Sequence, residues 1–199
     1  MQLAGLLMAA SGLAACGATD DSEAESASAS TAMENPAASL LPDNKLSKTE
    51  CDERSALRTT LYGALSGDVE WQHADMQCEA MPRPDGAGAR LRFAGRVGEN
   101  AVPIAFIIAM PDLERGIDAA EIASNVTVIE ESSARFFSTP GLESCWTDIE
   151  WNAARHEDGD RFVIGGVLYC ISPLPEVNGD ASISIPEMRF SGLLDWTAT

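Results

Sequence analysis

Apolar and polar residues follow three different patterns along this chain of 199 residues. Residues 3–15 form an apolar run in which Ser11 is the single polar side chain. Residues 17–44 are mostly Ala, Ser, Thr, Asp and Glu, with almost no large apolar side chain before Leu40. The rest of the chain consists of short alternating runs separated by turn residues, which predicts one folded domain over residues 46–199.

The alternating part of the chain predicts a mainly β fold. Its clearest strand is 89–97, where Leu91, Phe93 and Val97 alternate with arginines, so that one face would lie in the core and the other in water. The run 104–110 is apolar on both faces, which is typical of a central strand and, at this length, also of a buried helix. About eight or nine such strands with short connections predict an antiparallel β-sandwich or jelly roll. The remaining predicted strands cover residues 69–73, 125–130, 135–138, 145–153, 161–172 and 182–190. A continuation of the first of these to Cys78 through a bulge is the alternative.

One α-helix is predicted at the N-terminal end of the domain. Ser47 and Glu50 have the spacing of a capping box, in which each side chain bonds a backbone N–H at the helix start. Leucines recur at every fourth position over residues 57–65 and would form one apolar stripe. Gly67 is a suitable end, giving a helix of about 18 residues that carries Cys51 in its first turn.

The chain between residues 145 and 172 predicts a β-hairpin. Asp158-Gly159 has the composition of a tight two-residue turn, which would place Cys145 diagonally opposite Cys170 on the same face. A diagonal pair is somewhat too far apart for a disulfide, but a bulge or a slightly different turn would close the gap. Separately, Gly165-Gly166 inside an apolar strand predicts a bulge or a bend.

The tryptophans are the candidate binding residues. The hairpin register places Trp151 on the same face as Ile149 and Phe162, so Trp151 is predicted to lie in the core. Trp146 and Trp196 are the two that we expect to bind a ligand if they are exposed, because an aromatic ring combines a large contact area with a polar group. Packing inside the domain is the alternative for both.

Four cysteines fall in the predicted domain, an even number that suits two disulfides in an exported protein. Sequence order alone does not choose among the three pairings that four cysteines allow. The predicted strands favour Cys145–Cys170 together with Cys51–Cys78, each closing a loop of about 26 residues. Zinc binding is less favoured, because no cysteine pair has C-x-x-C spacing and the chain has only two histidines.

The apolar start ends in Leu13-Ala14-Ala15-Cys16, which resembles the lipobox of bacterial lipoproteins. At about 13 residues the run is too short to cross a bilayer, which requires roughly 20, and it has the length of a signal-peptide core. In lipoproteins this cysteine is lipidated and becomes the first residue. The segment departs from the usual signal in having no Lys or Arg before Cys16. The alternative is an ordinary cysteine in a secretory signal or a buried helix.

The resemblance implies a signal peptide at residues 1–15 and a lipidated Cys16, followed by a tether that ends at residue 45. The composition of that tether predicts disorder, because it offers too little apolar surface to offset the entropy of folding. Acyl chains contribute about 0.8 kcal/mol per buried methylene, so two or three of them hold a protein at a membrane. Many lipoproteins kept at the inner membrane have Asp after the cysteine. This chain has Gly17, which implies a periplasm-facing lipoprotein of the outer membrane.

The net charge of −18 comes from 31 acidic and 13 basic residues. A surface of that sign repels phosphate backbones and anionic lipids. Nucleic-acid binding and adhesion to membranes through basic patches are therefore excluded as expected functions.

Catalytic and metal-binding motifs are not evident in the sequence. There is no G-x-S-x-G motif, and His73 and His156 stand in no recognisable catalytic setting. Acidic residues are so numerous that no pair stands out as the acid and base of a glycosidase. Residues 157–160 and 178–180 carry oxygen ligands suited to calcium, but neither loop matches a calcium motif. We therefore expect no metal and no other cofactor.

Taken together, these patterns predict a lipid-anchored binding or structural module of the cell envelope that is not catalytic. Its expected partners are the membrane, through the lipid anchor, and an envelope protein or glycan. The alternative is an envelope hydrolase, for example one directed at glycans, that works through carboxylates outside any known motif.

Overall fold

The computed structural model describes residues 51–155 and 158–198. The predicted signal peptide, Cys16 and the tether lie outside these residues, as does His156. The described part is mainly β and contains thirteen strands, paired antiparallel in two sheets. Its helical structure is a single 3-10 turn, Leu142–Ser144, and no helix in it is long and apolar enough to cross a membrane.

The larger sheet has eight strands and contains the strands nearest to both ends of the described chain. From one edge to the other, six of them are β2 (Gly67–Gln72), β1 (Ala56–Gly63), β13 (Glu187–Asp195), β10 (Asp158–Cys170), β9 (Cys145–Arg155) and β6 (Ala119–Ala123). Beyond the stretch of β1 that pairs with β13, the end of β1 pairs with the short β12 (Ser182–Ser184), which in turn pairs with β11 (Leu174–Pro175).

The smaller sheet has five strands. Their order is β3 (Gln77–Pro82), β4 (Ala89–Val97), β5 (Val102–Met110), β7 (Asn125–Glu130) and β8 (Arg135–Ser138). The apolar run 104–110 lies in β5, which is paired on both sides, so the prediction of a central strand is confirmed. Its residues Ile104, Phe106 and Ile108 are fully buried.

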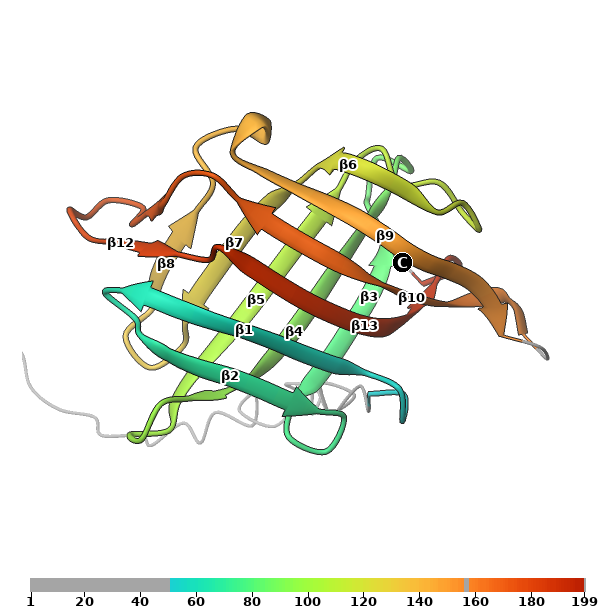
Figure 1. Cartoon of the computed structure of the whole chain (residues 1–199). Coiled ribbons are helices and arrows are strands. Elements are labelled where there is room, and N and C mark those ends of the chain that lie inside the picture. The colour runs from blue at the N-terminus through green and yellow to red at the C-terminus, as the bar shows by residue number, and fades with distance from the viewer. Residues whose placement is uncertain (1–50, 156–157, 199) are drawn as a thin grey trace, which may run out of the picture. The chain divides into compact units, whose positions relative to one another are not determined.

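The two sheets pack face to face around one apolar core. In Figure 1 the eight-stranded sheet lies in front, and its strands cross those of the five-stranded sheet behind. Aromatic side chains meet between the sheets: the rings of Trp71 in β2 and Phe106 in β5 pack edge to face, with centroids 5.7 Å apart. Phe93 of β4 lies 6.1 Å from Phe190 of β13. Each sheet therefore has one face in the core and one outer face.

The predicted N-terminal α-helix is wrong, because residues 56–63 of that segment form β1, which pairs with β2. The capping-box residues Ser47 and Glu50 lie outside the described residues. Leu57, Thr59 and Leu61 are buried at every second position, as in a strand with one face in the core. A spacing of four residues between leucines fits a period of two as well as a helical period, which explains the error. The proposed helix end, Gly67, has a φ of 145° and begins β2 after the turn.

The structure has more strands than the eight or nine predicted. One reason is that the predicted strand 69–73 does not continue through a bulge to Cys78. The chain instead forms two strands there, β2 and β3, which belong to different sheets. Between them the chain turns, and Asp75 and Gln72 exchange two hydrogen bonds there, one through the Asp75 carboxylate at 3.0 Å and one between backbones at 2.9 Å. The turn carries the chain from the eight-stranded sheet to the five-stranded sheet.

The predicted turn at Asp158-Gly159 is also wrong. Asp158 pairs with Arg155, so Asp158 and Gly159 already belong to β10. A contact from a distant loop holds this segment, because the guanidinium of Arg115 donates to the carbonyl oxygen of Gly159 and to the carboxylate of Asp160. This contact comes from outside the hairpin, so local turn propensity does not reveal it.

Both predicted disulfides are confirmed, Cys51–Cys78 and Cys145–Cys170. Cys145 lies directly opposite Cys170 rather than diagonally, for two reasons. Before Gly165 the strands β9 and β10 pair one residue away from the predicted register, and at Gly165-Gly166 the register shifts by one more residue. The predicted bulge at these glycines is therefore present and helps to bring the two cysteines together. The pairing of Cys51 was correct although the helix that supported it is absent from the described residues.

Candidate functional site

A continuous hollow lies on the outer face of the eight-stranded sheet. It consists of two adjoining cavities of about 530 and 280 Å³, which share Arg58, Glu70 and Arg189 in their walls. We call this hollow the trough. The polar and aromatic side chains that line it are Arg58, Thr60, Tyr62, Asp68, Glu70, Glu150, Trp151, Glu187 and Arg189.

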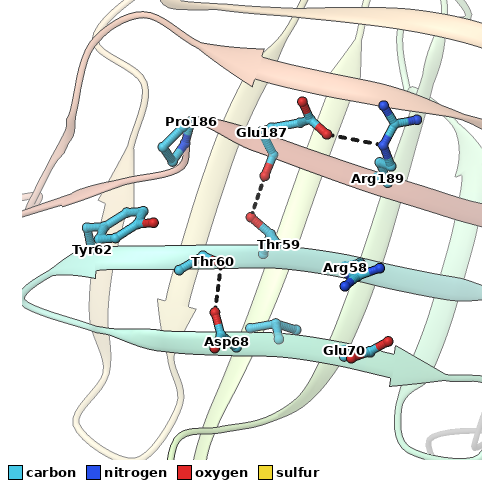
Figure 2. A pocket seen from close by; sticks show the side chains of 10 residues that line it. Arg58, Thr59, Thr60, Tyr62, Asp68, Glu70, Pro186, Glu187 and Arg189 are labelled. Atoms are coloured by element: carbon cyan, nitrogen blue, oxygen red, sulfur yellow. Dashed lines mark hydrogen bonds and ion pairs between the residues drawn. The ribbon is translucent and has the colours of Figure 1, made fainter.

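The alternation of the strands sends these side chains outward. Because Leu57 and Leu61 of β1 are buried, Arg58 and Tyr62 lie on the opposite face. In β13 the same alternation buries Met188 and Phe190 and exposes the residues on either side of them. Figure 2 shows the result in the larger cavity, with Tyr62 at one end and Arg58 with Arg189 at the other.

The floor of the trough contains two arginines at directly opposite positions. Arg58 of β1 faces Arg189 of β13 on one side and Glu70 of β2 on the other. Arg189 lies 3.1 Å from the carboxylate of Glu187 and 3.6 Å from that of Glu150. The guanidinium of Arg58 has no hydrogen-bond or ion-pair partner among the described residues. Like charges opposite each other in a sheet repel. Because only Arg189 has carboxylate partners, the positive charge of the Arg58–Arg189 pair is only partly neutralised.

Hydrogen bonds fix the polar groups next to the arginines. The hydroxyl of Thr60 donates to the carboxylate of Asp68 at 2.7 Å, and the hydroxyl of Thr59 donates to the backbone carbonyl of Glu187 at 2.7 Å (Figure 2). These bonds join β1 to both of its neighbours. The floor is therefore ordered before any ligand arrives.

Two aromatic side chains in the trough are largely open to solvent. Tyr62 is 54% exposed and Trp151 is 41% exposed. The prediction that Trp151 lies in the core is wrong, because the bulge opposite Gly165-Gly166 shifts the alternation of β9, burying Ile149 and Asn152 but not Trp151. The indole ring covers Gly165, where any Cβ would overlap it.

Trp146, one of the two predicted binding residues, lies on the outer face of the same sheet. Its ring stacks on Tyr169, with centroids 6.1 Å apart and an interplanar angle of 26°. Burial raises the pKa of the Tyr169 hydroxyl, and the charges of Asp148 and Glu121 raise it further. Because Tyr169 is paired with Glu187, this stack borders the trough without lining it.

Trp196, the other predicted binding residue, is partly buried and packs against the core. Its indole N–H is buried and has no hydrogen-bond partner among the described residues. A binding role for Trp146 or Trp196 remains a prediction, and the structure brings neither of them into the trough.

The trough offers a ligand hydrogen-bonding side chains and two aromatic rings. Within residues 51–155 and 158–198 no cluster of three or more His, Cys, Asp or Glu side chains could hold a metal ion. Side chains of Glu150 and Glu187 are 45% and 60% exposed, so water reaches both carboxylates. His73 lies exposed in the turn after β2.

Sequence analysis identified none of the residues in the floor of the trough. The signal that could have found them is the period of two over residues 57–62, where Leu, Thr and Leu alternate with Arg58, Thr60 and Tyr62. Read as a strand, that segment places an arginine and a tyrosine on one exposed face. The helix prediction concealed this face.

Comparisons with known proteins assign no function to the trough. Comparison of the chain with family models, with curated proteins and with solved structures finds no match. The function of the trough must therefore follow from its own residues.

Proposed function

We propose that this chain is a lipid-anchored binding module of the bacterial cell envelope, and that the trough on its β-sandwich domain binds an extended glycan. The observation that carries the proposal is the trough itself, with Tyr62 and Trp151 exposed beyond an ordered polar floor. Large exposed aromatic rings in a hollow are typical of binding sites.

The separation of the two aromatic rings indicates a long ligand. Trp151 lies in the same cross-strand row as Ala56, six positions before Tyr62 along β1 and three strands away. With about 3.3 Å per residue and about 4.8 Å per strand, the two positions are about 25 Å apart. A single sugar cannot reach both rings, whereas a chain of several sugars can stack on each.

The polar floor matches the hydroxyl groups of sugars. Each hydroxyl donates and accepts hydrogen bonds. The floor offers donors from Arg58 and Arg189 and acceptors from Asp68 and Glu70. Neighbouring hydroxyls of one sugar can therefore bond a guanidinium and a carboxylate together, and the aromatic rings of Tyr62 and Trp151 supply the apolar contact to sugars farther along the glycan.

The envelope location is supported by two independent features. One is the lipobox-like Leu13-Ala14-Ala15-Cys16. The other is the pair of disulfides, which is typical of an oxidising compartment such as the periplasm. We propose an anchor at Cys16 in the outer membrane, with the domain facing the periplasm on its tether.

Binding is tested with the full-length protein in detergent and purified envelope glycan, by co-sedimentation. Replacing Trp151 or Tyr62 by Ala should weaken binding about tenfold each, because each ring contact contributes about 1 kcal/mol beyond its area. The control is Phe136→Ala, which removes an aromatic that is 42% exposed on the other sheet. Failure of the wild type to bind any glycan, or equal binding by all variants, would refute the proposal.

The anchor is tested by growing cells with radiolabelled palmitate. Wild-type protein should carry the label and Cys16→Ala should not, because that cysteine is the only acceptor that the lipobox offers. Equal labelling of both proteins would contradict the anchor and would leave the glycan proposal to be judged by its own test.

A further inference from the structure

We infer that Arg58 makes the trough selective for glycan strands in which some sugars carry a single carboxylate. This inference rests on the proposed function, since it names the class of glycan that the trough takes. It follows from the charges around Arg58 and from the geometry of its strand.

The first step is the absence of a counter-ion at Arg58. Arg189 already has two carboxylates, those of Glu187 and Glu150. The carboxylate of Asp68 accepts from Thr60. Glu70 is directly opposite Arg58 in register, yet no ion pair joins them. Arg58 thus presents an unoccupied guanidinium fork to the trough.

The second step is what such a fork binds. A guanidinium holds a carboxylate through two parallel hydrogen bonds, a geometry that neutral hydroxyls match less well. A ligand carboxylate would also screen Arg58 from Arg189 across the strand pair. Binding would therefore supply the negative charge that the free protein does not provide at this position.

The third step limits how much negative charge the ligand carries. Four carboxylates line the trough, those of Asp68, Glu70, Glu150 and Glu187, and the chain has a net charge of −18. A polyanion would be repelled by them. A strand that alternates neutral sugars with sugars bearing one carboxylate places a charge at Arg58 and hydroxyls elsewhere.

Two matched ligands test the inference by isothermal titration calorimetry on the full-length protein in detergent. One is a tetrasaccharide of alternating N-acetylglucosamine and N-acetylmuramic acid without peptides. The other is the tetrasaccharide of N-acetylglucosamine alone, which lacks the lactyl groups and with them the carboxylates. The wild type should bind the acidic ligand at least tenfold more tightly, as expected for hydrogen bonds to a charged group.

Substitution of Arg58 distinguishes selective recognition of the carboxylate from nonspecific binding. Arg58→Gln should remove the preference for the acidic ligand. It should weaken binding of the neutral ligand less, because the Gln amide can still donate to a sugar hydroxyl. Arg92→Gln is the matched control, because Arg92 lies on the outer face of the other sheet. It should leave both affinities unchanged.

The outcomes separate the two proposals. Equal binding of both ligands by wild type and Arg58→Gln would overturn the selectivity but retain glycan binding. Binding of neither tetrasaccharide would overturn both. In the envelope glycan, short peptides are attached to the lactyl groups. Binding of such a peptide alone, in place of the sugar strand, would also overturn the inference, since it would identify a peptide site.

Discussion

The two outer faces of this molecule differ in whether every arginine on them has a hydrogen-bond acceptor. On the five-stranded sheet, Arg90, Arg92 and Arg96 project in a row from β4, and each has an acceptor: Glu79 at 3.4 Å, Glu131 at 2.7 Å and the carbonyl of Ala101 at 2.8 Å, respectively. On the eight-stranded sheet, Arg58 has no partner in the described part of the chain. A chain with 31 acidic residues has carboxylates to spare, so an arginine without one points to a role in binding.

The largest predicted effects on stability come from removing the disulfides, one of which lies within the eight-stranded sheet while the other reaches the five-stranded sheet. Cys145–Cys170 joins two strands within the eight-stranded sheet, whereas Cys51–Cys78 ties the segment before β1 to the five-stranded sheet. Their sequence separations are 25 and 27, so loop entropy assigns each about 3.5 kcal/mol. Replacing either pair by Ser should lower the free energy of unfolding by about that amount in urea titrations.

A difference between the two double-serine variants would measure what the entropy model omits. Equal losses would mean that constraint of the unfolded chain is the whole effect. A loss below about 1 kcal/mol for Cys145–Cys170 would contradict the prediction and show that pairing of β9 with β10 holds that end without the bond.

The strands of the two faces also differ in how well the sequence predicts them. The inner and outer positions of β4 were predictable, because large apolar residues alternate there with arginines. The hairpin of β1 and β2 was not, since Leu57 and Leu61 fit both periods and a capping-box motif precedes them.

The candidate site was less predictable than the fold. A single extra residue at the bulge reverses the side on which Trp151 lies, and alternation read from sequence assumes that no such residue exists. The meeting of Arg58 with Arg189 depends on the pairing of the first strand with the last, which neither local pattern contains. The disulfides were predictable because the cysteines are few and their strands are strongly patterned.

Distorting the bulge should destabilise the fold and move Trp151 out of the trough. A Cβ at Gly166 would overlap the backbone carbonyl of Asp148, so Gly166→Ala must push β9 away from β10. We expect a loss of about 3 kcal/mol in the free energy of unfolding, together with displacement of Trp151 from the trough. Denaturant titration followed by tryptophan fluorescence measures both.

The control for this variant lies in the neighbouring strand. A Cβ at Gly192 of β13 would meet the ring of Phe93 at 3.5 Å, which is ordinary contact. Gly192→Ala should therefore change stability by less than about 1 kcal/mol. If Gly166→Ala is as mild as Gly192→Ala, the close approach of the backbones at the bulge does not constrain the fold.

Acid should weaken the link between the sheets at the end where β11 meets β8. Arg135 of β8 donates to both carboxylate oxygens of Glu176 at 2.7 and 3.2 Å, and Glu176 directly follows β11. These bonds hold the pKa of Glu176 below its usual value of 4.5. The stabilisation is therefore complete above that value and is lost as the pH falls through the lower pKa of the folded state.

Glu176→Gln isolates this contribution. The free energy of unfolding of the wild type should fall more steeply below pH 4.5 than that of the variant, when both are measured by urea titration across that range. Parallel curves for the two proteins would show that the pair between the sheets adds no pH-dependent stability.

The smallest predicted effect compares the two faces most directly, because substituting an arginine should change the free energy of unfolding in opposite directions on the two faces. Arg92→Gln leaves Glu131 without its partner and should lower the free energy of unfolding by about 0.5 kcal/mol. Arg58→Gln relieves the repulsion with Arg189 and should raise it by about 0.3 kcal/mol. Added salt should shrink both changes, since both are electrostatic and lie at the surface. If Arg58→Gln destabilises the fold as Arg92→Gln does, then Arg58 has a structural role, and its open guanidinium is no evidence that the trough awaits a charged ligand.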